Sequence, residues 1–153
     1  MVHAHSARDR ARLVSEAERL CAEAGETLTP LRRRVLELLI AKDGPAKAYD
    51  LLAELDGESG PAKPPTIYRA LDFLMKLGLA HKIESLNAFV ACDVGACARA
   101  TIFLICDKCG RTDEFDAGHA LVDLGEAARK DGFEIKHTMI EAKGLCAACK
   151  QAA

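Results

Sequence analysis

The sequence has no apolar run long enough to cross a bilayer, and its first residues, MVHAHSARDRARLVSEAERL, are charged almost from the start. A membrane-spanning helix needs about 20 mostly apolar residues, and a secretory signal peptide needs an apolar segment near its start. Neither pattern is found here. We therefore expect a cytoplasmic protein that has no membrane partner.

The chain also lacks an excess of charge of either sign. It contains 21 Lys and Arg against 23 Asp and Glu, which gives a formal net charge of −2. A domain that attracts nucleic acid through its overall charge is strongly basic. Any DNA-binding face must therefore be a local arrangement of charge.

The cysteines do not form an even set, since there are seven of them. In a reducing compartment an odd number indicates metal binding or reactive thiols rather than a disulfide framework. With 153 residues, 50% of them hydrophobic, the chain can bury the core of one ordinary domain or of two small ones. The patterns along the chain favour two.

The first half of the chain is predicted to be helical, because its apolar residues recur at helical spacing. We expect a disordered tail at residues 1–11 and a first helix at about 12–24. TPLRRRVLELLIAKDG predicts a second helix, with Thr29 as its N-cap and Pro30 in its first turn. AYDLLAEL and PTIYRALDFLMKLGLA predict two more, separated by the Gly- and Pro-rich segment DGESGPAKPP.

The last of these helices has two different faces. One stripe is apolar and the opposite one is polar, carrying Tyr68, Arg69, Asp72 and Lys76. HKIES and AFVAC follow it and predict a β-hairpin. This order is typical of a winged helix-turn-helix: three helices, the last with a polar and basic face, and then a hairpin.

Beyond the hairpin the pattern changes to strands mixed with a helix. TIFLIC is typical of a strand buried on both sides, and RTDEF can pair with it. AGHALVDLGEAARKDG predicts an amphipathic helix, and FEIKHTMIEAKG alternates as strands do. We predict an α+β chain with a winged-helix domain at 1–92, a hinge at 93–98 and a small α/β domain at 99–153.

Two C-x-x-C pairs are the strongest chemical signal in the sequence: Cys106 with Cys109, and Cys146 with Cys149. Each pair places two thiolates at a tight turn, and two such turns supply the four sulfurs that zinc prefers in closed structural sites. The alternatives are unpaired thiols in a core and a redox dithiol of the thioredoxin type. That chemistry needs only one pair, normally at a helix N-terminus after a strand, so two pairs near glycines favour zinc.

These segments together resemble the ferric uptake regulator family, most closely its zinc uptake regulator branch. The resemblance runs from about Ala17 to Cys149 and is carried by LTPLRRRVLELL, AYDLL, KPPTIYRALDFLMKLGLAHKIES, FLICDKCG and IEAKGLCAAC. It implies a homodimeric, metal-dependent repressor that binds a palindromic, AT-rich operator and is not an enzyme with a small organic substrate. The α/β domain would then be the dimerisation domain.

The resemblance also implies a second, regulatory zinc ion in each chain. His81 at the start of the wing, Cys92 at its end and Glu114 after the first C-x-x-C pair match the family's ligand positions. The family's hinge histidine is replaced by Arg99, a permanent cation that cannot bind zinc. Cys97 lies two residues earlier, on the same face of an extended segment, and we hypothesise that it is the fourth ligand. The alternatives are a site with three protein ligands and a water, and a site that recruits Asp93 or another group.

Ligands from both sides of the hinge would let one ion fix the angle between the domains and favour the DNA-binding dimer. Thiolate ligation favours zinc over iron or manganese. The leading hypothesis is thus a zinc-responsive repressor of zinc-uptake genes. The alternatives are a sensor of another metal or of peroxide within the same family, and a dithiol oxidoreductase.

The polar stripe of the fourth helix supplies the expected DNA contacts. The resemblance and the helical projection agree on Tyr68 and Arg69 as the residues that face the groove, where they can contact bases or phosphates. Other cations are expected to contact phosphates and to make binding salt-dependent: Arg32, Arg33, Arg34 and Lys63. For any one of these four, an ordinary solvated helix face is the alternative.

Overall fold

The structure, a computed structural model, describes residues 7–42, 44–59, 63–92, 100–116, 118, 121–136 and 138–151. The chain divides into two compact units, one within residues 3–94 and the other made mainly of residues 95–153. The predicted hinge at 93–98, with Cys97, lies outside the described residues, as does Arg99. Among the described helices none is both long and apolar enough to cross a membrane.

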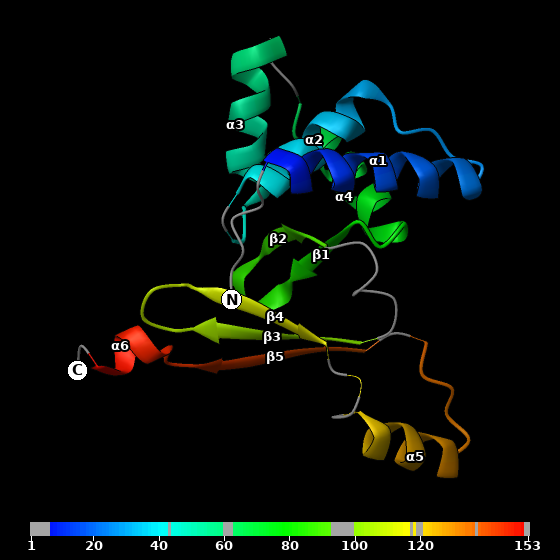
Figure 1. The fold of residues 1–153 in the computed structure, drawn as a ribbon, viewed down its shortest axis with the longest axis vertical. Helices are drawn as coiled ribbons and strands as arrows, with labels where there is room; N and C mark the ends of the chain where they lie inside the picture. The colour runs from blue at the N-terminus through cyan, green and yellow to red at the C-terminus, as the bar shows by residue number, and fades with distance from the viewer. Residues whose placement is uncertain are drawn as a thin grey trace. The chain divides into compact units, whose positions relative to one another are not determined.

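In its described residues, the first unit contains four α-helices and a hairpin (Figure 1). The helices are α1 (Ala7–Glu23), α2 (Pro30–Ala41), α3 (Ala48–Ser59) and α4 (Pro64–Lys76). The expected tail at 1–11 is therefore wrong from residue 7 onward. The segment ARDRAR contains strong helix formers and no Gly or Pro, so nothing in it stops the helix. Likewise α3 continues through Gly57, since a single glycine weakens a helix without ending it.

The predicted cap and faces of the helices are confirmed. The Thr29 hydroxyl accepts a hydrogen bond from the Arg32 N–H at 3.4 Å, and Pro30 is the first residue of α2. On α4, Ile67, Leu71 and Leu74 are buried, whereas the opposite stripe is exposed. The three buried side chains of α4 form one core with side chains from the other helices: Leu13, Ala17, Cys21, Val35, Leu39 and Leu51.

The wing consists of β1 (Ala80–Ile83) and β2 (Ala88–Ala91), paired antiparallel. A short 3₁₀ turn (Glu84–Leu86) joins them, and Asn87 ends it with φ 46°, a left-handed conformation that asparagine tolerates. Ala46 and Phe89 exchange two backbone hydrogen bonds of 2.8 Å, which attach the segment before α3 to the wing. The hairpin is thus anchored on the helical core.

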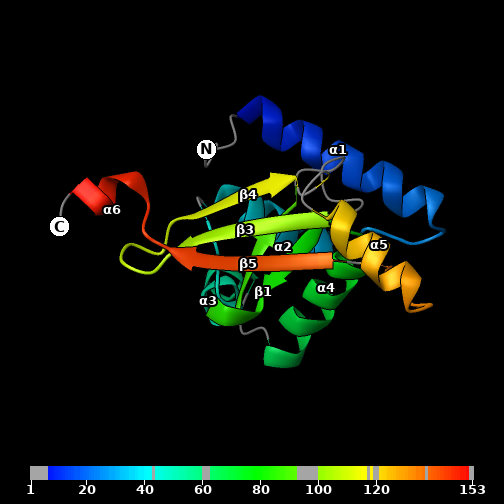
Figure 2. The same cartoon turned by 90° about the horizontal axis from the view of Figure 1, so that it is seen from below.

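The second unit is built on a three-stranded sheet in the order β4-β3-β5 (Figure 2). β3 (Ala100–Cys106) pairs antiparallel with β4 (Thr112–Asp116), as predicted, and parallel with β5 (Thr138–Gly144). Two helices complete the unit, α5 (Val122–Lys130) and α6 (Ala147–Gln151). The expected strand at 133–144 is observed from Thr138, which pairs with Ala100 at the start of β3, and the described residues 133–136 lie outside any strand.

β3 is buried on one side only, which corrects the expectation for TIFLIC. Thr101, Phe103 and Ile105 are buried, whereas Leu104 is 42% exposed. The strand register places further apolar side chains beside Leu104 on the same side of the sheet, because paired residues point to the same face. We call this set the apolar face: Ile102, Leu104, Phe115, Ile140 and Ala142.

Candidate zinc centre and DNA-binding face

The two C-x-x-C pairs are brought together at one end of the sheet. Cys106 is the last residue of β3, and its N–H donates to the Arg111 carbonyl at 2.8 Å, which closes the turn that carries Cys109. Parallel pairing places Gly144, at the end of β5, beside Cys106. The second pair follows immediately, with Cys149 on α6. All four sulfurs therefore converge from segments far apart in the sequence.

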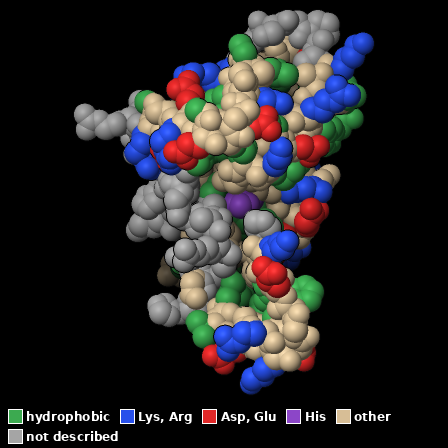
Figure 3. All heavy atoms as spheres, turned by 90° about the vertical axis from the view of Figure 1, so that its right-hand side faces the viewer, with side chains coloured by type: hydrophobic (Ala, Val, Ile, Leu, Met, Phe, Trp, Pro, Cys, Tyr) green, Lys and Arg blue, Asp and Glu red, His purple; other side chains and the backbone are tan. Residues whose placement is uncertain are grey.

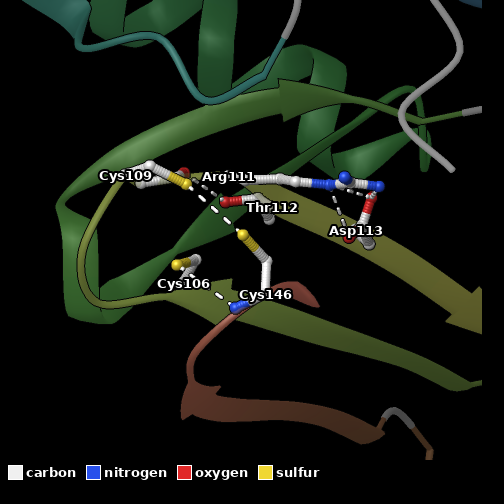
Figure 4. Close-up of polar contacts among 7 residues, drawn as sticks. Cys106, Cys109, Arg111, Thr112, Asp113 and Cys146 are labelled. Carbon is white, nitrogen blue, oxygen red and sulfur yellow. Dashed lines mark hydrogen bonds and ion pairs between the residues drawn. The ribbon is translucent and has the colours of Figure 1, made fainter. Parts of the chain in front are cut away.

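The spacing of the sulfurs fits a tetrahedral zinc ion. All four Sγ atoms lie within 4.8 Å of one another. Zinc binds sulfur at about 2.3 Å, so the corners of a regular tetrahedron of sulfurs lie about 3.8 Å apart. The Sγ atoms of Cys109 and Cys146 are 3.8 Å apart. The cluster thus already has the dimensions of a structural zinc site (Figure 4).

Backbone groups prepare the cluster to hold negative charge. The Cys146 N–H donates to the Cys106 Sγ at 3.4 Å. Backbone hydrogen bonds from Cys146 and Cys109 lower the pKa of Cys106 to about 6. Hydrogen bonds with the Cys146 and Cys109 side chains raise the pKa of Cys149 to about 12, because thiols this close share protons when no metal is bound. Metal binding would release these protons.

An ion pair lies directly beside the first C-x-x-C turn. The Arg111 guanidinium contacts the Asp113 carboxylate through Nε at 3.0 and 3.2 Å and through Nη2 at 3.2 Å. Figure 4 shows the Arg111 side chain running from the turn towards Asp113. This pair was not among the residues predicted for the site. Its only signal was the i, i+2 spacing, which places both residues on one side of an extended chain.

The wing brings two of the predicted regulatory ligands together. His81 lies on β1, and Cys92 follows β2, where its N–H donates to the Leu79 carbonyl at 3.0 Å. Their ligand atoms lie within 4.8 Å of each other. Burial lowers the pKa of His81, which favours the neutral imidazole that binds metals. Cys92 is only 2% exposed and is disulfide-bonded in this structure, so it must be reduced before it can act as a ligand.

The other predicted regulatory ligands do not lie on the wing. Glu114 lies on β4 of the second unit, where it pairs with Phe103 and is exposed. Cys97 and the neighbouring Arg99 belong to residues 93–99, which are not described. The ligand set as a whole stays a prediction.

The predicted groove-facing residues are available on the surface. Tyr68 is 42% exposed, and Arg69 and Lys63 are exposed as well. On the face drawn in Figure 3, Lys and Arg side chains alternate with Asp and Glu rather than forming a continuous basic surface. This mixture agrees with the formal net charge of −2. The exposed stripe of α4 therefore stays the predicted DNA-reading surface.

The arginines of α2 are engaged within the protein. Arg32 lies with its guanidinium carbon 3.6 Å from the centre of the Phe73 ring and donates to the Thr27 carbonyl at 2.8 Å. Arg33 bonds Glu37 at 3.2 Å and also pairs with Glu18 of α1. Arg34 contacts Glu37 at 3.3 Å. To contact phosphates as predicted, these arginines would thus have to give up their present partners within the protein.

Comparison with known proteins gives a consistent result. The family model described as the ferric uptake regulator family matches residues 23–143. The chain is 44% identical over 138 residues to the zinc uptake regulation protein of Escherichia coli, covering 90% of this chain and 81% of that protein. The chain belongs to the ferric uptake regulator family. The same level of identity is found with the zinc uptake regulation protein of Shigella flexneri.

Solved structures of family members extend this result to the fold. A zinc uptake regulator complexed with zinc and DNA superposes with a TM-score of 0.86 and 42% identity, covering 94% of this chain and 96% of that one. The holo form of XcZur superposes with a TM-score of 0.79 and 43% identity, covering 93% and 99%. The predicted α+β fold, with a winged helix followed by a small α/β domain, is confirmed.

Tyr49 is an exposed aromatic residue that was not predicted as part of the DNA-binding face. Tyr49 lies in the first turn of α3 and is 69% exposed, the largest exposure among the large hydrophobic side chains described as exposed. AYDLLAEL predicted a helix at this position, but no role was predicted for Tyr49. An exposed tyrosine can stack on bases or contact phosphates, and Tyr49 is a further candidate for the DNA-binding face.

Proposed function

We propose that this chain is a zinc-responsive, DNA-binding transcriptional repressor that controls zinc-uptake genes. The observation that carries the proposal is the match to a zinc uptake regulator complexed with zinc and DNA, at a TM-score of 0.86 over 94% of this chain. The sulfur cluster and the exposed stripe of α4 supply the two chemistries that such a protein needs. No catalytic step is required.

The first zinc ion would be structural. Cys106, Cys109, Cys146 and Cys149 would hold it, and the ion would supply a closed, redox-inert link between the end of β3 and the segment after β5. A dithiol oxidoreductase would require one pair to work without the other. The convergence of all four sulfurs within 4.8 Å favours the structural ion.

The second zinc ion would be regulatory, with His81, Cys92 and Glu114 as ligands and Cys97 as the fourth. The short distance between the His81 and Cys92 ligand atoms and the neutral state of the buried imidazole support it. A thiolate ligand favours zinc over iron, which argues against an iron or peroxide sensor. These ligands come from both units, so zinc would bind one arrangement of the units more tightly than others. It would thereby shift the population towards the arrangement that binds DNA.

The repressor would act as a homodimer on a palindromic operator. The apolar face of the second unit supports dimerisation, since it exposes side chains such as Leu104 and Phe115 that a partner can bury. Other exposed apolar side chains of this unit include Val122, Leu124 and Phe133. A symmetric dimer would present two α4 helices to successive major grooves. Tyr68 and Arg69 would read the operator, while Lys63 and the α2 arginines would contact phosphates.

The test is the zinc content of the reduced protein against a graded series of competing chelators, for the wild type and Cys97→Ser. We expect two ions per chain, one resistant and one exchangeable, with the exchangeable ion weakened in the variant. DNA binding by the wild type should follow occupancy of the exchangeable ion. If both proteins bound two ions equally, Cys97 would not be a ligand, whereas the regulatory site itself would remain supported. A single resistant ion in the wild type would overturn the regulatory site.

Reduction is the essential control in this experiment. Without a reductant, Cys92 is expected to remain in its disulfide, and the exchangeable ion should be lost while the resistant ion stays. Equal occupancy of the exchangeable site in oxidised and reduced protein would show that Cys92 is not a ligand.

A further inference from the structure

Asp72 places a negative charge in the middle of the exposed stripe of α4, the surface that we expect to enter a groove of DNA. The residue is exposed. Helical spacing puts it one turn after Tyr68 and Arg69 and one turn before Lys76, all of which are exposed as well. The carboxylate is therefore surrounded by the side chains that are predicted to read the operator.

Asp72 does not pair with the cations that its own helix offers. Arg69 lies three residues before it and Lys76 four residues after it, and an acid four residues before a lysine is the favourable order for a helical ion pair. The Lys76 Nζ instead contacts the Glu26 Oε1 at 3.1 Å, in the segment between α1 and α2. Within the described parts of the chain, neither Asp72 nor Arg69 has a side-chain hydrogen bond or an ion pair. The carboxylate is thus available to a molecule outside the protein.

The stability of α4 gives no reason for an aspartate at this position. Aspartate is a poor helix former in the interior of a helix. The helix dipole favours an acid in the first turn, but α4 begins at Pro64 and Asp72 lies well beyond that turn. An exposed charge is ordinary on most protein surfaces. On a surface that approaches DNA, however, a carboxylate repels the phosphates and lowers the affinity for every sequence unless it meets a hydrogen-bond donor.

The major groove offers a carboxylate few partners. An ionised carboxylate only accepts hydrogen bonds. The donors on the base edges of this groove are the N4 amino group of cytosine and the N6 amino group of adenine, whereas guanine and thymine present acceptors that would repel a carboxylate. The adenine amino group has the N7 acceptor of the same base beside it. Cytosine is therefore the base that a carboxylate reads best.

We propose that Asp72 is a specificity-determining residue that accepts a hydrogen bond from the N4 amino group of one cytosine in each half-site of the operator. The inference rests on the proposed function, in which α4 enters the major groove. The carboxylate weakens binding to DNA in general and recovers the loss only where a cytosine faces it. Glu26 contributes by holding Lys76, which would otherwise be a partner for Asp72 within the helix.

The test compares zinc-loaded, full-length wild type with Asp72→Asn and Asp72→Ala. Duplexes of random sequence are first selected for binding to the wild type, and affinities are then measured for the selected duplex and for variants changed at one base pair of one half-site. For the wild type, replacing one particular C·G pair by T·A should weaken binding about tenfold, as expected of a single base contact. Asp72→Ala should lose this preference. Asp72→Asn should prefer adenine there, because an amide can pair with both N6 and N7 of that base.

The second measurement isolates the repulsion from phosphates. Affinity for a duplex of scrambled sequence should rise by up to about fivefold in both Asp72 variants, the size of one exposed charge interaction. The gain should shrink as the salt concentration rises. Asp123→Asn, at an exposed position of α5, makes the same change in net charge and is the matched control. Its base preferences and its affinity for the scrambled duplex should equal those of the wild type.

The outcomes separate this inference from the proposed function itself. Unchanged base preferences in both Asp72 variants would overturn the inference and leave the repressor intact. A preference lost at an A·T pair instead would assign the contact to adenine and overturn the assignment to cytosine. Equal loss of affinity for all duplexes, together with a lower melting temperature, would give Asp72 a structural role and also overturn the inference. If the zinc-loaded wild type selected no sequence at all, the proposed function on which the inference rests would be overturned.

Discussion

The Cys146 backbone N–H donates a hydrogen bond to the Cys106 Sγ across 3.4 Å, so the second C-x-x-C turn supports the first. The fold of the unit and the ligand set of the zinc centre therefore depend on the same residues. This relationship links metal content to stability.

Replacing Cys106 by Ser should release the resistant zinc ion and unfold the sheet of the second unit. Structural zinc contributes about 10–16 kcal/mol of binding free energy in small zinc domains, far more than a typical domain's margin of stability. Zinc content and circular dichroism would measure both effects. Cys21→Ala is the control: it lies in the helical core and should cost roughly 1 kcal/mol without loss of zinc. A folded sheet in zinc-free Cys106→Ser would contradict the prediction.

Replacing Arg69 by Ala should weaken operator binding by about 1–3 kcal/mol and relax specificity at one base pair, as expected for a base-contacting arginine. Arg33→Gln should cost less, because Arg33 already pairs with Glu18 and Glu37. In Lys63→Gln, the slope of the logarithm of the DNA-binding constant against the logarithm of salt concentration should become less steep by about one. Equilibrium titrations at several salt concentrations would test all three. A larger loss for Arg33→Gln than for Arg69→Ala would reverse the assignment.

Introducing a charge on the apolar face should break the dimer. Leu104→Asp places a carboxylate in the middle of a surface that we propose a second copy covers, and burying an unpaired charge is strongly unfavourable. Sedimentation or light scattering should then report a monomer. Lys130→Asp, at an exposed position of α5, provides the control and should leave the dimer intact. A dimer of unchanged stability in Leu104→Asp would place the interface elsewhere.

The wing should lose stability in mild acid. Burial lowers the pKa of His81 below its unfolded value of about 6.5, so the unfolded chain binds a proton more readily than the folded one. The contribution to stability is therefore greatest above about pH 6.5 and is lost as the pH falls through the window between the unfolded and the folded pKa. Denaturant unfolding of the zinc-free, reduced protein from pH 8 to 5 would measure it.

His81→Gln supplies the comparison for the acid experiment, because the amide does not titrate in this range. Its stability should change less between pH 7 and 5 than that of the wild type. Identical pH profiles for the two proteins would show that His81 is not the group responsible.

Local patterns predicted the parts of the molecule that depend on neighbouring residues. The faces of α4, the Thr29 cap and the C-x-x-C pairs all follow from spacing along the chain. The one-sided burial of β3 does not follow from spacing. An apolar run does not reveal whether the chain itself or a partner covers the second face of the strand. The pairing of Arg33 with Glu18 depends on how α1 packs on α2, which no local pattern specifies.

The parallel pairing of β3 with β5 has a consequence for how the protein folds. Parallel neighbours cannot be joined by a tight turn, so the chain must travel through β4 and α5 before β5 can dock and bring Gly144 beside Cys106. Until then, Cys106 and Cys109 can offer a metal only two sulfurs. Docking of β5 and completion of the zinc shell are thus one long-range event, which is slow for entropic reasons. Zinc at the four cysteines and the docked β5 would therefore stabilise each other as this unit folds, separately from any zinc that the finished protein senses.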